Sequence, residues 1–528
     1  MMHAVPSREE TRASSRLAPC YARAMERTID RFFEESARLH GSRPFLRFEG
    51  ETIRYASFAR VVSRRAAGFA RAGIGRGDRV GILLPNGPEF VEALFALLRL
   101  GATVVPVNHF LAAPEVAKLL ERASVDAGVV GCDQLRLIEG VPDPPKGLFA
   151  VGGGGRGRPF EPLAEGDDLP PGCPRPGPDD AAFLLFTSGT EGEPRGVLLS
   201  HRNLAANVRQ CTEALGPTEK ERFLVFLPLF HTFTLTVCLL LPAALGAAIL
   251  LFRSARNFPS ILRDGILLGR ATYFVGVPAV FNALARRRLP FLLRKLHRVR
   301  VMISGSAPLP ARTVEAVEGL FGAPLLEGYG LTEAGPVVAV NLPGRRVVGT
   351  VGPPLPGVEV RVVRESGNGL MHGEVGELLV RGENVAGAFL GEESPVRDGW
   401  LRTGDLASVD TEGFITIHDR MRDLILVRGL NVYPREVEEA IEEHPSVAAA
   451  AVVRAMSETK GEVPRAFIVP AEGARPTAAV ILGHLKGRLA PYKTPATIEF
   501  VAELPRSGTG KVLRRVLQAR PLPPGGGA

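Results

Sequence analysis

The chain has 528 residues, which predicts three or four folding units at about 150 residues each. Hydrophobic residues make up 45% and charged residues 23%, as in an ordinary soluble globular protein. The net charge of +8 favours anionic ligands or an anionic membrane surface, but no helix-turn-helix, zinc-finger or aromatic RNA-binding signature accompanies it, so we expect no nucleic-acid partner.

The five cysteines are an odd number with no two close together, which argues against a disulfide framework and fits a cytoplasmic protein. Residues 1–27 have no apolar core, and we expect no secretory signal there.

The first part of the chain alternates apolar strand-like runs with helical runs. RVGILLP (79–85) predicts a buried strand, residues 89–101 a helix that ends at a glycine, and ATVVPVN (102–108) the next strand. This βαβ rhythm predicts a doubly wound α/β sheet. Residues 141–180 are rich in Pro and Gly and predict a loop between subdomains.

Residues 223–252 contain no Lys, Arg, Asp or Glu and are long enough to cross a bilayer. Pro228 and Pro242 interrupt the run, and His231 and several Thr lie inside it. We therefore predict a strand, a loop, a helix and a second strand inside the α/β core, with a membrane span as the alternative.

The second half of the chain predicts two smaller units. Three alternating runs predict the strands of a β-rich subdomain: 357–363, 376–382 and 413–419. After Arg420 the pattern predicts a compact α+β module of about 110 residues, with helices at 434–445 and 478–489. We therefore place an N-terminal domain at 1–420 and a C-terminal domain at 421–528. The predicted fold class is α/β, with a large N-terminal domain of doubly wound sheets, a β-rich subdomain and a small α+β C-terminal domain.

The segment LLFTSGTEGEPRGVLLSHRNL (184–204) runs from an apolar strand into a loop dense in Thr, Ser and Gly. Glycines allow backbone N–H groups to converge on an anion, and Arg195 adds fixed positive charge, which suits a polyphosphate. The spacing is not that of a Walker A loop, and a surface hairpin is the alternative. LPRSGTGKVLRR (504–515) is not Walker A either, because Pro505 and Val512 occupy positions that require Gly and Ser or Thr.

Four further segments complete an ordered set: VMISGSAPLP (301–310), LEGYGLTEAGP (326–336), DGWLRTGDL (398–406) and DRMRDLILVRGLNVYPREVEEAI (419–441). In this order the six segments resemble those of the adenylate-forming superfamily of acyl-CoA synthetases, luciferases and adenylation domains. The resemblance runs from about residue 28 to 515 and is most like the medium- and long-chain fatty acyl-CoA synthetases. It implies an N-terminal domain that binds ATP and the acid, and a mobile C-terminal lid that carries a catalytic lysine.

The resemblance assigns roles in ATP binding and adenylation residue by residue. It places around ATP the residues Thr187, Ser188, Gly189, Thr190, Gly192 and Arg195 at the β- and γ-phosphates, Gly305, Ser306, Ala307, Pro308 and Tyr329 at the adenine, and Asp405 and Arg420 at the ribose. Thr332 would bind the α-phosphate, and Glu333 would hold Mg²⁺, which prefers carboxylate oxygens and substrate phosphates. Lys511 would be the catalytic lysine, because a positioned ammonium stabilises the charge that builds on the phosphate oxygens.

For the second half-reaction, the resemblance implies a hinge at Arg422 and a thiol tunnel at Gly429. His231 would orient or gate the carboxylate, with a packed core histidine as the alternative. Arg195 stands where the family usually has Lys, and Glu191 where Thr is common. Arg428 stands beside the thiol tunnel where Ser or Gly is common, which leaves coenzyme A and a carrier-protein thiol open as acceptors.

Phe230 to Phe233 contains no Asp to hold an α-ammonium, which disfavours an amino-acid substrate, and the walls expected at 231–240 and 273–281 are apolar. We therefore predict activation of a medium- or long-chain fatty acid to acyl-AMP and its transfer to coenzyme A, with ATP, Mg²⁺ and coenzyme A as cofactors. The alternatives are a ligase that loads a carrier-protein phosphopantetheine and a non-catalytic acyl- or nucleotide-binding homologue. The basic run 285–300 predicts either a solvated helix face or peripheral contact with anionic lipid at the inner face of a membrane.

Overall fold

The structure is a computed structural model. It describes residues 28–521 apart from 154–155, 171–172, 189–193, 288–295, 365–368, 392, 428–429, 458–460 and 507–510.

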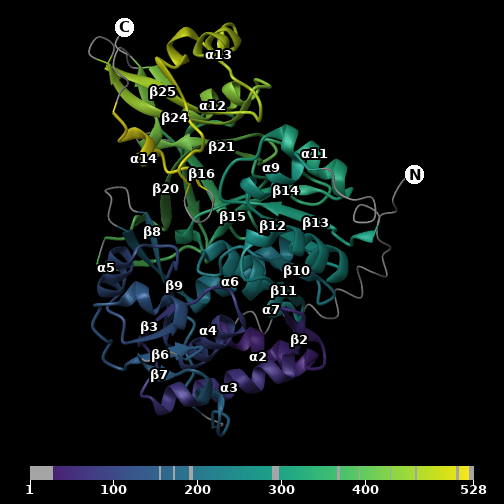
Figure 1. Ribbon diagram of the computed structural model, residues 1–528, viewed down its shortest axis with the longest axis vertical. Coiled ribbons are helices and arrows are strands. Elements are labelled where there is room, and N and C mark those ends of the chain that lie inside the picture. The colour runs from purple at the N-terminus through teal and green to yellow at the C-terminus, as the bar shows by residue number, and fades with distance from the viewer. Residues whose placement is uncertain are drawn as a thin grey trace.

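Two eight-stranded sheets form the large N-terminal part of the molecule (Figure 1). In spatial order, the first contains β15 (Val337–Val340), β14 (Leu325–Gly330), β13 (Val301–Ser304), β12 (Tyr273–Gly276), β10 (Arg222–Val225), β11 (Ala248–Leu251), β1 (Pro44–Phe48) and β2 (Glu51–Arg54). The second contains β18 (Ala388–Phe389), β9 (Pro194–Ser200), β8 (Ala181–Ser188), β4 (Thr103–Pro106), β3 (Arg79–Leu83), β5 (Ala127–Gly131), β6 (Leu148–Val151) and β7 (Arg158–Pro159). The inner strands of both sheets are parallel, and antiparallel strands close one edge or both. The predicted doubly wound α/β domain is confirmed.

Helices cover these sheets and meet between them. The helices of this part are α2 (Ile29–His40), α3 (Tyr55–Arg71), α4 (Pro88–Leu100), α5 (Ala113–Ala123), α6 (His201–Leu215), α7 (Leu241–Leu245), α8 (Phe258–Ser260), α9 (Pro278–Ala285) and α11 (Ala311–Phe321), with π-helices η3 (Thr234–Leu240) and η5 (Ile261–Leu268). Helix α4 packs on β3 and β4, α6 on β9 and α7 on β11, while α2 touches α4, α6 and α7. One continuous apolar core therefore joins both sheets. Helix α4 ends as predicted, because Gly101 adopts the left-handed conformation (φ 73°) that glycine tolerates best.

The apolar run 223–252 folds into β10, a loop, the helical pair η3–α7 and β11, as predicted. These strands are central in the first sheet, and both of their faces are covered by protein, which explains the absence of charge. Among the described residues, no helix has the length and apolarity needed to span a membrane.

The predicted β-rich subdomain is an antiparallel sheet of five strands: β16 (Glu359–Val363), β17 (Gly376–Arg381), β20 (Trp400–Val409), β19 (Val396–Arg397) and β21 (Ile415–Arg420). The C-terminal module has its own sheet of β23 (Leu430–Val432), β22 (Ile425–Val427), β25 (Gly461–Pro470), β24 (Val447–Ser457) and β26 (Thr497–Phe500), with helices α12 (Pro434–Glu442), α13 (Ala478–Leu485) and α14 (Arg514–Gln518). Its apolar cluster is separate from the main core, which fits an α+β unit. Helix α13 stops at Leu485 and does not reach Leu489, because Gly487 turns the chain with φ 83°.

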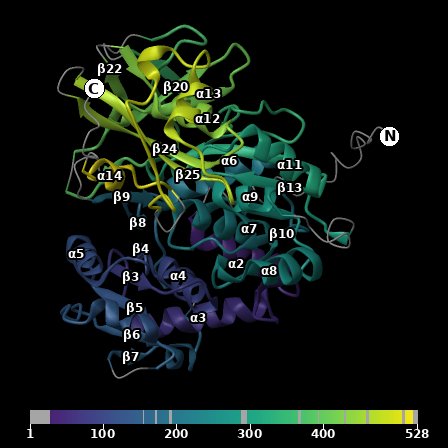
Figure 2. The ribbon, with the colours of Figure 1, turned by 45° about the horizontal axis from the view of Figure 1, so that its top comes forward.

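The C-terminal module lies against the first sheet's helices (Figures 1 and 2). Arg286, just after α9, donates a hydrogen bond of 3.0 Å to the carbonyl oxygen of Ala448, and Arg312 in α11 donates to that of Glu442. These contacts place the last segment of the chain next to the loops that follow β13 and β14.

Candidate active site

The most constrained group in the predicted site is the carboxylate of Asp405. Strands β20 and β21 are antiparallel, and their register places Asp405 directly opposite Arg420. Arg420 Nε lies 2.9 Å from Asp405 Oδ1, and Tyr329 Oη donates a hydrogen bond of 2.5 Å to Oδ2. The Asp405 side chain is 4% exposed. Because each carboxylate oxygen carries two lone pairs, Asp405 still has acceptor capacity for a ligand's hydroxyl groups.

Tyr329, at the end of β14, comes from a different sheet and joins this pair. Burial and the adjacent Asp405 carboxylate raise the pKa of Tyr329 well above its usual value, so its hydroxyl keeps its proton and remains a donor. The Thr403 hydroxyl also accepts the Asp405 backbone N–H at 3.1 Å. The loop from β14 and the hairpin β20–β21 are thus connected at one carboxylate.

Thr332 and Glu333 follow Tyr329 in the 3-10 turn η6 (Thr332–Ala334). The Thr332 hydroxyl accepts a hydrogen bond of 3.2 Å from Thr232, the residue after His231. Burial raises the pKa of Glu333, and the positive charges of Arg420 and Arg195 partly oppose that shift. A buried carboxylate with raised pKa gains most from a cation placed beside it.

That carboxylate fits the expected Mg²⁺ only in a particular way. Among the described residues, no group of three or more His, Cys, Asp and Glu side chains could hold a metal ion by itself. Mg²⁺ commonly takes one or two carboxylates and completes its shell with substrate phosphates and water. Glu333 is therefore compatible with Mg²⁺ that arrives with ATP.

The C-terminal module brings Lys511 into this site. Burial and the positive charges of Arg420 and Arg422 lower the pKa of Lys511 to about 8, while Asp405 and Asp423 act in the opposite direction. The Lys511 side chain is exposed to solvent at its surface, yet the surrounding protein and the charges of Arg420 and Asp405 act on its ammonium group. Arg422 lies beside it in the 3-10 turn Met421–Asp423. The ammonium group of Lys511 is thus close enough to the Asp405 carboxylate for the two charges to interact.

The predicted phosphate loop begins where β8 ends. Thr187 pairs with Arg195 across the β8–β9 hairpin, and Ser188 is the last residue of β8. The Arg195 guanidinium carbon lies 5.6 Å from the centre of the Phe389 ring. Gly189, Thr190 and Gly192 lie outside the described residues, as does Gly429 of the predicted thiol tunnel. The described part of the loop therefore brings the positive charge of Arg195 close enough to Glu333 to act on the pKa of its carboxyl group.

The residues Gly305, Ser306, Ala307 and Pro308 follow β13 directly. A side-chain carbon on Gly305 would lie 3.0 Å from the Phe233 ring, so glycine lets this backbone approach the ring closely. Ser306 has a positive φ of 74°, an uncommon backbone conformation for a residue with a side chain.

An apolar pocket opens beside this turn and beside Tyr329. Its lining is formed by Cys211, Leu215, Phe233, Val237, Ile303, Gly305, Ser306, Gly328, Tyr329, Gly330, Pro336, Val337 and Val340. Phe233 and Val237 belong to the first wall expected from the sequence. The second expected wall, 273–281, is absent from this lining, since Tyr273 stacks on Phe223 in the core and Phe281 packs on Phe274.

His231 lies in the loop before η3, and its ring packs on that of Phe230 with centroids 5.1 Å apart. Burial lowers the pKa of His231 to about 4, so its imidazole is neutral at pH 7. The neighbouring Thr232 reaches Thr332. His231 is therefore both packed against an aromatic ring and placed next to the predicted phosphate contacts.

Sequence reasoning missed Thr232, Thr403, Cys211 and Leu215. Thr403 lies inside a recognised segment, so its spacing from Asp405 could have pointed to a supporting hydroxyl. Cys211 and Leu215 lie on α6, one helical turn apart, and read from the sequence as ordinary core positions. Only the tertiary structure brings them into one pocket lining with residues of β14 and β15.

An enzyme that joins a carboxylate to AMP needs a ribose acceptor, a phosphate loop and a mobile cation at one place. Tyr329, Asp405 and Arg420, with the start of the phosphate loop at Thr187 and Lys511 of the C-terminal module, supply described candidates for these parts, as expected of an adenylate-forming enzyme. Residues 33–390 match the AMP-binding enzyme family and residues 436–511 match the AMP-binding enzyme C-terminal domain, so the chain belongs to this family.

Individual relatives cover nearly the whole chain. A feruloyl-CoA synthase from Amycolatopsis sp. is 36% identical over 92% of this chain and 97% of its own length. A long-chain-fatty-acid–CoA ligase from Escherichia coli O157:H7 is 32% identical over 92% of this chain and 93% of its own. The crystal structure of the anthranilate CoA ligase AuaEII in complex with anthranoyl-AMP superposes with a TM-score of 0.85 at 27% identity, covering 93% of this chain and 96% of that one. The chain is accordingly an AMP-forming acid–CoA ligase by family, and such ligases use ATP, Mg²⁺ and coenzyme A.

Proposed function

We propose that the chain activates an apolar carboxylic acid without an α-amino group to its acyl-adenylate and transfers the acyl group to coenzyme A. The observation that carries this proposal is the junction of Tyr329, Asp405 and Arg420 with Lys511 beside it. The junction combines a carboxylate that can accept hydrogen bonds from ribose hydroxyls with a cation suited to phosphate oxygens. An apolar pocket begins at Tyr329.

In the adenylation step, the acid's carboxylate oxygen attacks the α-phosphate of ATP, and pyrophosphate leaves with the β- and γ-phosphates. Lys511 and Arg195 stabilise the charge that develops on the phosphate oxygens, and the Thr332 hydroxyl holds the α-phosphate. Asp405 accepts the ribose hydroxyls, and Arg420 keeps the carboxylate in place. Mg²⁺ held by Glu333 and the phosphates would neutralise part of the charge of ATP. The acid is already ionised at pH 7, so no protein base is required.

For thioester formation we propose that the C-terminal domain, 421–528, rotates about Arg422 and withdraws Lys511. The change of sheet between β21 and β22, and the separate core of the module, support a boundary near residue 420. The thiol would enter past Gly429, lose its proton to solvent and attack the acyl carbonyl carbon as a thiolate, so that the C–S bond forms as the C–O bond to AMP breaks. We propose that His231, whose imidazole is neutral at pH 7, orients that carbonyl.

The sequence favours a medium- or long-chain fatty acid, and a compact aromatic acid is the second candidate. A specific observation supports the second candidate: Cys211 and Leu215 from α6 form part of the pocket wall together with Val340. Side chains that line the pocket on this side favour a compact acid over a long tail. The feruloyl-CoA synthase relative is consistent with this compact class.

The test is pyrophosphate release with octanoate, palmitate and ferulate, each with and without coenzyme A. Release with the two fatty acids alone supports the fatty-acid assignment, and release with ferulate alone supports the aromatic one. Adenylate formation without any coenzyme A thioester would favour a carrier-protein thiol as the acceptor in place of coenzyme A. No release with any acid would favour a non-catalytic binding protein.

We further propose a cytoplasmic location, with peripheral membrane contact as an addition that a fatty-acid substrate would favour. The basic residues between 285 and 300 support this contact through attraction to anionic lipid. Sedimentation of the full chain with anionic and with neutral vesicles tests it, because contact of this kind must depend on the lipid charge.

A further inference from the structure

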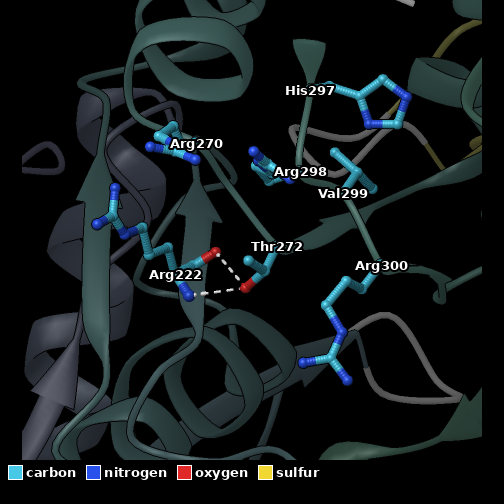
Figure 3. Close-up of a pocket in the computed structure, with 7 residues that line it drawn as sticks. All are labelled: Arg222, Arg270, Thr272, His297, Arg298, Val299 and Arg300. Carbon is cyan, nitrogen blue, oxygen red and sulfur yellow. Dashed lines mark hydrogen bonds between the residues drawn. The ribbon is translucent and has the colours of Figure 1, made fainter. Parts of the chain in front are cut away.

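A second pocket lies at the amino ends of the parallel strands of the first sheet, and the candidate active site lies at their carboxyl ends. It is formed where β10, β12 and β13 begin, and Arg222, Arg270, Thr272, Arg298 and Arg300 contribute to its lining (Figure 3). These strands are parallel, and the predicted catalytic residues follow their carboxyl ends. A four-residue strand rises about 13 Å, so the basic pocket and the predicted catalytic groups lie at opposite ends of these strands, about one strand length apart.

Three guanidinium groups of this pocket have no acidic partner among the described residues. Figure 3 shows Arg222 and Arg270 on one side and Arg298 facing them, while Arg300 points away. Arg300 Nη1 is 2.7 Å from Glu221 Oε1, so its charge is already compensated. Arg222 Nη1 donates to the carbonyl oxygen of Gly269 at 2.9 Å, a neutral acceptor.

The positive charge of Arg270 acts on the Arg222 guanidinium. The pKa of Arg222 is lowered by burial and then by the positive charges of Arg270, Arg47 and Arg43. Guanidinium groups held together without carboxylates are stabilised by an anion that each can bind through two parallel hydrogen bonds.

The backbone holds Arg270 in an unfavourable conformation. Arg270 follows the π-helix η5 and the capping residue Gly269, and its φ is 57°. Glycine is the usual residue in the left-handed region after a helix, because other side chains are strained there. Strained residues of this kind cluster where a side chain serves a ligand. The left-handed turn after the helix fixes where the Arg270 side chain leaves the backbone, and that side chain lines the same pocket.

We propose that Arg222, Arg270 and Arg298 form a binding site for a phosphate-bearing ligand, distinct from the ATP site. The shared chemistry is a phosphomonoester or diphosphate group, carried either by a soluble metabolite or by a lipid headgroup. The site needs no adenylation chemistry and so does not depend on the proposed function.

The test compares the full chain with the double variant Arg270→Gln, Arg298→Gln. The matched control is Arg60→Gln, Arg136→Gln, which removes the same charge from exposed positions on α3 and on the 3-10 helix Cys132–Ile138. Inorganic pyrophosphate is titrated calorimetrically at low salt, and co-sedimentation is measured with phosphatidylcholine vesicles containing or lacking phosphatidic acid.

We expect the wild type and the control to bind one more equivalent of pyrophosphate than the double variant, or to bind the second equivalent at least tenfold more tightly. Vesicle binding lost only in the double variant would assign the site to a lipid headgroup, and loss of pyrophosphate binding alone would assign it to a soluble ligand. Equal pyrophosphate and vesicle binding by all three proteins overturns the proposal. So does an equal loss in the control, since net charge would then explain the binding.

Discussion

Arg420 Nε lies 2.9 Å from Asp405 Oδ1, and the two residues form a register pair between the antiparallel strands β20 and β21. The adjacent backbone holds both side chains, so little conformational freedom remains to be lost when a ligand binds. Tyr329 fixes the other carboxylate oxygen from a separate sheet. The pair therefore presents a preorganised acceptor at the junction of the N-terminal sheets and the β-rich subdomain.

The first prediction concerns Asp405→Asn. The amide cannot accept two charge-assisted ribose hydrogen bonds and leaves Arg420 uncompensated, a loss of about 3 kcal/mol. We expect kcat/KM for ATP in pyrophosphate release to fall about 100-fold. Asp398→Asn is the control, because Asp398 is exposed and its φ of 51° suits Asn equally well. Equal kinetics of the two variants would remove Asp405 from the ATP site.

The second prediction separates the two half-reactions through Lys511→Ala. Adenylation should be abolished, while thioester formation from supplied acyl-adenylate should be spared, because only the first step needs a cation at the α-phosphate. Lys486→Ala, an exposed lysine after α13, should leave both steps intact. An equal loss of both steps in Lys511→Ala would contradict the swinging-domain mechanism.

The third prediction is a pH profile. With the pKa of Lys511 lowered to about 8, the cationic form predominates below that pH and is lost above it. We expect kcat/KM for ATP, which reports the free enzyme, to decline above pH 8. Lys511→Arg keeps its charge throughout this range and should show a lower but flatter profile. An unchanged decline in Lys511→Arg would assign the titration to another group.

The fourth prediction concerns stability in acid. Burial lowers the pKa of His201 to about 4, and the described residues provide no hydrogen-bond partner for either ring nitrogen. In the unfolded chain this histidine takes up a proton near pH 6.5. Its contribution to the free energy of unfolding is therefore complete above pH 6.5 and is lost as the pH falls toward 4. His201→Phe should remove about 3 kcal/mol of pH dependence from the free energy of unfolding. Urea unfolding at several pH values measures this, and the exposed variant His372→Gln should retain the wild-type slope.

The fifth prediction tests the acid pocket with Gly305→Ala. The added methyl group would lie 3.0 Å from the Phe233 ring and narrow the pocket. We expect kcat/KM for the preferred bulky acid to fall about tenfold, equivalent to about 1.4 kcal/mol, and that for acetate to change less. Gly319→Ala on α11 meets open space and should leave kinetics unchanged while stabilising the helix by up to about 1 kcal/mol. An equal fall in kcat/KM for bulky and small acids would show that Gly305 does not contribute to the selection of the acid.

Local sequence predicted the fold where its signals are local. The run 223–252 could be read as strand, helix and strand because Pro228 and Pro242 punctuate it, and α4 ended at Gly101 because glycine tolerates that cap. Helix α13 ended early, at Leu485, just before the turn at Gly487, because the end of a helix depends on single turns. The proposed roles of the site residues came from the resemblance of the six ordered segments to those of the adenylate-forming superfamily.

The sequence by itself determined the family, the parallel α/β framework and which residue types stand at the site, because strand periodicity and ordered motifs are properties of adjacent residues. Only the tertiary structure decided that Tyr329, Asp405 and Lys511 converge, since they come from two sheets and a separate module. It also placed Cys211 and Leu215 in the lining of the pocket beside Tyr329, because the packing of α6 is a long-range property. The cluster of Arg222, Arg270 and Arg298 likewise exists only because three parallel strands begin at the same edge of a sheet.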